Sequence, residues 1–273
     1  MRINTNVNAM QATTSMAKNS ALAGNSMEKL STGLAINKAG DNAAGLAVSE
    51  KMRSQIRGME QADKNVQDGI SLVQTAEGAL GEAGEIVQRM RELSVQGANG
   101  TYSEKDRASI KTELTQLQEE IVQIAEETKF NGNDLMNDDN IEFAIQAGAN
   151  DEIRTIEMVN LKAIAEAVGN ELGNVADDAP DTYKDFIEHL DTALEGINTA
   201  RATLGAQQNR LEATSSNLST SVENLSSAES RIRDVDVAKE MVELSKMNLL
   251  TQTSQAMVAQ AKSQPENVMS LLR

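Results

Sequence analysis

The stretch VQDGISLVQTAEGALGEAGEIVQRM, residues 66 to 90, decides the fold. Its apolar residues recur at intervals of three or four positions, which is the spacing of a coiled-coil seam and not of a strand. The pattern predicts a long helix over residues 59–97, about 58 Å in length at 1.5 Å per residue. The seam residues are Val66, Ile70, Val73, Ala76, Leu80, Ala83, Val87 and Met90.

Two further seams of the same kind follow along the chain. One begins at Ile110, and the other runs from Ile187 to Ile232 with polar interruptions. The link at residues 97–100 is short, which favours an antiparallel pair, and Ser103 with Asp106 three residues on predicts a helix N-cap. The predicted fold class is mainly α, with long antiparallel helices that form a rod-like coiled-coil bundle and with paired N- and C-terminal helices. The shorter seam is Ile110, Leu114, Leu117, Ile121 and Ile124.

The helical pattern fails in the middle of the chain, beyond Thr128. Residues 141–146 alternate in the manner of a strand, and residues 148–151 are typical of a turn. Ile153, Thr155 and Glu157 would form a second strand that runs back along the first, so we expect a small β-hairpin. A short helix and an acidic loop are expected between residues 160 and 180.

The composition excludes several classes of protein. Cys is absent, and His189 is the only His, so thiolate and multi-His metal sites and His-paired nucleophiles are not expected. Residues 101–200 carry 23 Asp and Glu against 7 Lys and Arg, and hold the whole excess behind the net charge of -16. An acidic chain without basic clusters does not predict nucleic acid as a partner. No run is long and apolar enough for a membrane span or a secretory signal peptide.

Two glycines raise the question of a nucleotide site. Gly40 and Gly45 have the spacing of a phosphate-binding loop, but Leu46 and Ala47 stand where the loop needs Lys and then Ser or Thr. We therefore interpret residues 34–50 as a joint between helices. His189, with Asp185 four residues before it, is interpreted as an ordinary pair on a helix surface. We expect no enzyme activity, no cofactor and no metal.

Both ends of the chain are poor in charge. Residues 1–35 carry four charged side chains, yet small and apolar residues keep helical spacing there, and residues 235–273 have the same character. Such helices bury little area and are marginal alone in water. They are either frayed tails or helices that pack against each other and against other copies of the chain, and we favour self-assembly. The candidate self-assembly residues are Ile3, Val7, Met10, Met241, Leu244, Leu249 and Val258.

Several stretches of the chain resemble the bacterial flagellin family. The resemblance covers residues 1–150 and 180–273 and implies a small form that lacks large variable outer domains. It implies a structural subunit that polymerises into the flagellar filament for swimming motility. A hook–filament junction protein is the alternative, and a soluble signalling or chaperone-like hairpin leaves the low-charge ends unexplained. The stretches are MRINTNVNAMQA (1–12), KLSTGLAINKAGDNAAGLAVSEKMRSQIRG (29–58), QRMRELSVQGANGT (88–101), KFNGNDLMN (129–137) and NLLTQTSQAMVAQAKSQPENVMSLLR (248–273).

The resemblance also implies a division into two domains. Residues 1–42 and 235–273 would form a discontinuous terminal coiled coil that lines an inner tube and includes the joint, where Gly40 and Gly45 would allow the bend. Residues 43–234 would form a helical rod of the outer tube, with the hairpin and the acidic loop at about 130–180.

Partners and location are likewise implied by the resemblance. The partners would be other copies of the chain, an export chaperone at residues 235–273, and the cap and junction proteins of the filament. A flagellin-sensing Toll-like receptor of animal hosts would contact Arg89, Leu93 and Glu113. The protein would leave the cell unfolded through the flagellar type III apparatus, so it would be secreted and extracellular.

Overall fold

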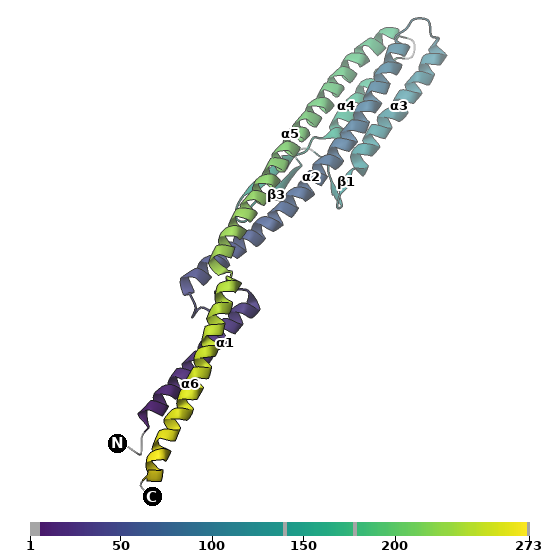
Figure 1. Ribbon diagram of the computed structural model, residues 1–273. Helices are drawn as coiled ribbons and strands as arrows, with labels where there is room; N and C mark the ends of the chain where they lie inside the picture. The colour runs from purple at the N-terminus through teal and green to yellow at the C-terminus, as the bar shows by residue number, and fades with distance from the viewer. Residues whose placement is uncertain (1–5, 139–140, 177–178, 272–273) are drawn as a thin grey trace. The chain divides into compact units, whose positions relative to one another are not determined.

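The computed structural model describes residues 6–138, 141–176 and 179–271, and within them the fold is mainly α (Figure 1). Long helices dominate, as predicted, and four short strands lie in the middle of the chain, of which two were predicted. The elements are α1 Val7–Thr32, α2 Ala43–Gly97, α3 Glu104–Glu127, β1 Lys129–Phe130, β2 Asn133–Asp134, β3 Glu142–Gln146, β4 Ile153–Glu157, α4 Leu161–Gly173, α5 Pro180–Arg233 and α6 Val237–Leu271.

The chain divides into two compact units. Residues 1–55 and 223–273 make up one, here called the terminal unit, and residues 56–222 make up the other, here called the bundle unit. Both divisions fall within helices, α2 and α5. The sequence-based division at residues 42 and 235, with its inner-tube and outer-tube roles, stays a prediction.

The predicted seam forms the buried stripe of α2 in the bundle unit. Seven of its eight residues are at most 1% exposed, and Ile70 is partly buried against the same core. The helix begins at Ala43 rather than at residue 59, because Asn42 caps it by accepting the N–H of Gly45 (2.9 Å) and the following residues Ala43 and Ala44 favour helix. Periodicity alone missed these first turns because they carry small residues.

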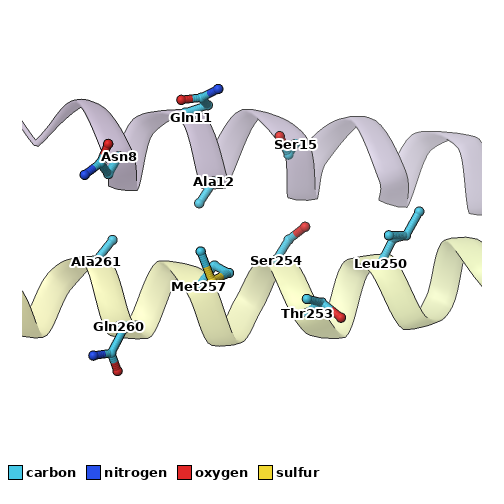
Figure 2. A pocket seen from close by; sticks show the side chains of 10 residues that line it. All are labelled: Asn8, Gln11, Ala12, Ser15, Leu250, Thr253, Ser254, Met257, Gln260 and Ala261. Carbon is cyan, nitrogen blue, oxygen red and sulfur yellow. The ribbon is translucent and has the colours of Figure 1, made fainter.

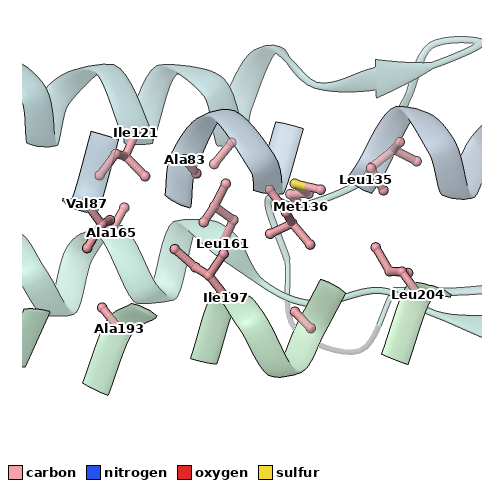
Figure 3. Packing of buried hydrophobic residues seen from close by; sticks show 14 of the residues in the cluster. Ala83, Val87, Ile121, Leu135, Met136, Leu161, Ala165, Ala193, Ile197 and Leu204 are labelled. Atoms are coloured by element: carbon pink, nitrogen blue, oxygen red, sulfur yellow. The ribbon is translucent and has the colours of Figure 1, made fainter. Parts of the chain in front are cut away.

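One hydrophobic core joins four helices of the bundle unit. Figure 3 shows Ala83 of α2, Ile121 of α3, Leu161 of α4 and Ile197 of α5 converging, with Met136 from the segment after β2 among them. All five side chains are nearly or completely buried. Since Ala, Leu, Ile and Met make up most of this core, the scarcity of aromatic residues reflects narrow helix-to-helix packing.

Two hairpins interrupt the helices. β3 pairs antiparallel with β4, with Phe143 opposite Ile156, which confirms the predicted hairpin. β1 and β2 form a second hairpin that was not predicted. Its turn places Asn131 at φ 51° and Gly132 at φ 84°, and Asn-Gly is the favoured pair for such a two-residue turn.

The helices of the terminal unit are paired, as expected. α1 and α6 pack along each other (Figure 1). Asn6 caps α1 by accepting the N–H of Ala9 (3.0 Å) and also donates from Nδ2 to the carbonyl of Ala261 (2.6 Å). Within the described ranges, no helix is both long and apolar enough to cross a membrane.

Candidate self-assembly surface

The terminal unit has apolar residues but almost no core. Of the thirteen large hydrophobic side chains that are exposed among the described residues, eleven belong to this unit. Of the fully buried hydrophobic residues described, the terminal unit contributes Ile36 alone. The apolar surface is therefore turned outward. The eleven are Val7, Met10, Leu22, Met27, Val48, Val237, Met241, Val242, Leu249, Leu250 and Met257.

Four of the seven predicted self-assembly residues lie on this surface. Val7 and Met10 of α1 and Met241 and Leu249 of α6 are about half exposed or more. Leu244 and Val258 are half-buried, and Ile3 lies outside the described residues.

An open groove runs between α1 and α6. Its volume is about 370 Å³, and Figure 2 shows Ala12 and Ala261 directed into the space between the helices. None of the residues that line it is charged, and most are small or carry an uncharged polar group. The groove therefore offers hydrogen bonds and shallow apolar contact without the cost of burying a charge. The lining is Asn8, Gln11, Ala12, Ser15, Leu250, Thr253, Ser254, Met257, Gln260 and Ala261.

The middle of α6 carries no charge. Lys246 pairs with Glu243 at 3.3 Å, and residues 247–261 carry no charged side chain. This stretch of α6 lies beside the nearly uncharged start of α1, as the Asn6–Ala261 hydrogen bond shows. Asn6 was missed as a contributor, although an Asn just before the first apolar helical position is an N-cap signal.

Two short segments connect the helices of the terminal unit and are bound to each other. Leu34 and Asp234 form an isolated antiparallel bridge, with Ala35 N–H donating to the carbonyl of Arg233 (2.6 Å) and Val235 N–H to that of Gly33 (3.0 Å). The Arg233 side chain, 9% exposed, contacts Glu50 with Nη1 2.5 Å from Oε1. The chain thus passes from α1 to α2 and from α5 to α6 through one joint. The sequence analysis did not identify Arg233 as part of the joint.

Of the two glycines predicted for the joint, Gly45 has a structural explanation. Gly33 (φ 73°) adopts the left-handed conformation that ends α1, whereas Gly40 and Gly45 are not left-handed. Gly45 lies inside α2, where a Cβ would come within 2.8 Å of both Asn42 Nδ2 and Ile36 Cδ1. Close approach to the helix cap, rather than backbone freedom, is therefore what requires Gly45.

The three residues expected to contact a Toll-like receptor, Arg89, Leu93 and Glu113, do not all lie on the surface. Arg89 pairs with Glu113 across α2 and α3 and with Glu92 on its own helix, both at 3.1 Å. Hydrogen bonds to Glu92 and Glu113 raise the pKa of the Arg89 guanidinium above its ordinary value. Leu93 is 3% exposed and packs in the core, so its side chain is not presented on the surface.

His189 pairs differently from the sequence interpretation. Its Nε2 lies 3.6 Å from Glu171 Oε2 on α4, whereas Asp185 was the expected partner. The prediction was wrong because it considered only neighbours on the same helix, while α4 packs close enough to supply a carboxylate.

Comparisons with known proteins agree with the geometry of the long terminal helices. Residues 3–141 match the bacterial flagellin N-terminal helical region, and residues 187–272 match the bacterial flagellin C-terminal helical region. A flagellin of Halalkalibacterium halodurans is 50% identical over 276 residues, and the flagellar filament 33 kDa core protein of Treponema phagedenis is 45% identical over 286 residues. Both alignments cover 100% of each chain.

A solved structure shares the fold at lower identity. The crystal structure of Bacillus cereus FlgL superposes with a TM-score of 0.56 at 19% identity, over 66% of this chain and 99% of that one. At that identity the likeness shows the fold alone. The full-length relatives are flagellins, so a hook–filament junction protein is not favoured. The chain belongs to the bacterial flagellin family and is a structural subunit of the flagellar filament.

Proposed function

We propose that copies of the chain assemble into the filament through the terminal unit. The supporting observation is the contrast between its exposed apolar side chains and its near lack of buried ones. A paired helix surface of this kind gains stability when a neighbouring copy covers it, because apolar area leaves water. The proposed contact residues are Ile3, Val7, Met10, Met241, Leu244, Leu249 and Val258.

Several weak contacts repeated along a polymer are enough for assembly. Full burial of one large aliphatic side chain contributes about 1.5–3 kcal/mol, and a half-exposed side chain that becomes covered contributes roughly half of that. Val7, Met10, Met241 and Leu249 together therefore supply several kcal/mol per subunit. The uncharged groove between α1 and α6 adds no charge to desolvate.

Seeded electron microscopy tests this proposal. Purified full-length chain is mixed with short filament fragments, and M10K and L249K place a charge on the proposed interface. We expect long filaments from the unchanged chain and none or short ones from the two variants. The matched control is V95K, since Val95 is also exposed (51%) but belongs to the bundle unit. Normal growth of M10K and L249K would exclude this surface.

A trimmed chain provides a second comparison. A version without residues 1–35 and 235–273 lacks α1 and α6 entirely, so we expect it to stay monomeric beside the same seeds. Growth of the trimmed chain would place the assembly contacts in the bundle unit instead. Failure of the unchanged chain to extend seeds of its own kind would contradict polymerisation itself.

The same apolar surface supports a role for an export chaperone. We propose that residues 235–273 are bound by such a chaperone before export, because Met241, Val242 and Leu249 would otherwise self-associate in the cell. We also propose, from the membership of the flagellin family, that the chain is exported through the flagellar type III apparatus and contacts cap and junction proteins in an extracellular filament. Co-expression should give a complex with the chaperone that L249K weakens and V95K does not.

We further propose recognition by the flagellin-sensing Toll-like receptor through Arg89 and Glu113. Both side chains are about half exposed, and a partly ordered Arg is a common hot-spot residue. In a reporter-cell assay, R89A should lower the response without changing the melting temperature. L93A, unlike R89A, should lower the melting temperature, because Leu93 is buried and its truncation costs about 2–5 kcal/mol of folding stability. An unchanged response for R89A would exclude the site.

A further inference from the structure

Two arginines of the bundle unit lie together without a carboxylate. Arg154 of β4 and Arg210 of α5 line one small cavity of about 10 Å³, which has room for one water-sized group. Among the described residues, neither guanidinium takes part in an ion pair. By contrast, Arg91 and Arg201 of α2 and α5 each reach a carboxylate on another helix, at 2.6 and 3.7 Å.

The local sequence explains why the two arginines find no acidic partner. Arg154 stands opposite Ile145 in the hairpin, and the diagonal positions are Phe143 and Ala147. Glu152, two positions before Arg154, is directed at Gly148 in the turn instead. The positions three and four residues from Arg210 on α5, where a helical ion pair would form, are Ala206, Gln207, Ala213 and Thr214. The lack of a carboxylate is notable because residues 101–200 carry 23 acidic against 7 basic side chains.

A neighbouring amide extends the site. Gln207 Oε1 is buried beside the cavity and has no hydrogen-bond partner. Rotation of the Gln207 side-chain amide by 180° places the donor Nε2 where Oε1 lies, because the amide oxygen and nitrogen have nearly the same size.

We propose that Arg154 and Arg210 bind a carboxylate of a neighbouring copy of the chain. The positive charge of the two arginines identifies an acidic side chain as the group that binds there. A heterologous contact joins two different patches of one surface, and the acidic residues of the bundle unit are the abundant complement of a basic patch. The bidentate fork of Arg matches a carboxylate oxygen pair, and one such oxygen fits the cavity.

This contact rests on assembly into a filament but is separate from the terminal unit. It also offsets a cost of assembly, because strongly acidic bundles repel each other when they are brought side by side. The contact should weaken as salt is added, since exposed charges are screened over about 8–10 Å at moderate ionic strength.

Charge reversal tests the site in the full-length chain. The critical concentration for seeded growth is measured for the unchanged chain, R154E/R210E and the charge-conserving R154K/R210K. We expect the reversed variant to need at least about tenfold more protein. We expect R154K/R210K, which keeps the charge but loses the bidentate fork, to fall between the reversed variant and the unchanged chain. K105E is the matched control, because Lys105 is an exposed cation of the same unit that has no ion pair among the described residues. Equal melting temperatures show that all variants fold.

Cross-linking identifies the occupant. Filaments are grown from equal amounts of ¹⁵N-labelled and unlabelled R154K/R210K and treated with a carbodiimide, which joins a Lys amine to a carboxylate in contact with it. We expect peptides that contain Lys at position 154 or 210 from one chain and Asp or Glu from the differently labelled chain. Cross-links that join only equally labelled peptides would overturn the proposal.

The two proposals fail in distinguishable ways. If the unchanged chain grows and R154E/R210E has the same critical concentration, the carboxylate site is wrong while assembly through the terminal unit stands. If the unchanged chain does not extend its own seeds, polymerisation fails and the carboxylate site fails with it.

Discussion

At the scale of single residues, α2 shows how the surroundings decide what a glycine does. A Cβ at Gly97 would lie 2.6 Å from Cδ1 and Cε1 of Tyr183. That ring is fully buried, and its hydroxyl donates to the carbonyl of Arg107 (3.2 Å), so it has no free direction in which to move. A Cβ at Gly78 would meet nothing within 4 Å.

Substitution by Ala should therefore change the free energy of unfolding in opposite directions at these two positions. G97A should lower the free energy of unfolding by about 1–3 kcal/mol through overpacking against Tyr183. G78A should raise it by about 0.5–1 kcal/mol, because Ala favours a helix interior over Gly. Thermal unfolding of the two monomeric variants measures the difference, and a stabilising G97A would contradict the packing described here.

At the scale of elements, the N-terminus of α3 depends on an ionised side chain. Ser103 and Asp106 form a capping box in which each side chain accepts the backbone N–H of the other residue. The hydrogen bonds from the side chain and the backbone N–H of Ser103 lower the pKa of the Asp106 carboxyl. The stability that this carboxylate contributes is therefore present above the ordinary pKa of Asp, about 3.9, and is lost as the pH falls through the lowered value.

We expect the first turn of α3 to fray in acid and D106A to remove part of this pH dependence. Hydrogen exchange of the amides of residues 104–107, measured between pH 3 and pH 7 and corrected for intrinsic rates, reports the change. E104A is the control, since Glu104 is in the same turn but is outside the capping box. A D106A profile that matches the unchanged chain would argue against the capping box.

The joint of the terminal unit gives a second prediction at this scale. E50A removes the carboxylate that contacts the nearly buried Arg233. A buried polar group left without its partner costs about 1–3 kcal/mol, and a charged group costs more. The amides of Ala35 and Val235, which donate across the joint, should exchange faster in E50A. E60A, which removes an exposed carboxylate of α2 in the bundle unit, should leave both amides unchanged.

At the scale of the whole molecule, the two units should differ in local stability. Residues 66–90 contribute a buried seam, whereas α1 and α6 expose most of their apolar residues. Regions with few buried contacts open at low free energy. Hydrogen exchange of the monomer should therefore be faster in residues 7–32 and 237–261 than in residues 66–90. Polymerisation should slow the first two ranges, and equal rates before and after it would contradict assembly through the terminal unit.

Much of the fold could be predicted because its signals are local. The heptad spacing of Val66 to Met90, the Ser103 cap and the alternation in residues 141–146 each depend on near neighbours in the chain. The first turns of α2 and the hairpin of β1 and β2 were missed although Asn42 and Asn131-Gly132 are also local signals. They were overlooked because periodicity was given more weight than caps and turns.

The candidate site was less predictable because it depends on which faces are covered. The sequence marked Val7, Met10 and Leu249 as apolar, but exposure separates an assembly surface from a core, and exposure is a property of packing. Leu93 illustrates the reverse case, since a matched contact position proved to be buried.

The sequence by itself determined the helical character of the chain and its low-charge ends, because these follow from spacing and composition along the chain. It also indicated the structural family, through the resemblance of several stretches to flagellins. Only the tertiary structure decided that Arg233 meets Glu50, that His189 meets Glu171, and that Arg154 and Arg210 share one cavity without a carboxylate. Each of these contacts joins residues that are distant in the chain, and their distances depend on how the helices pack rather than on local preference.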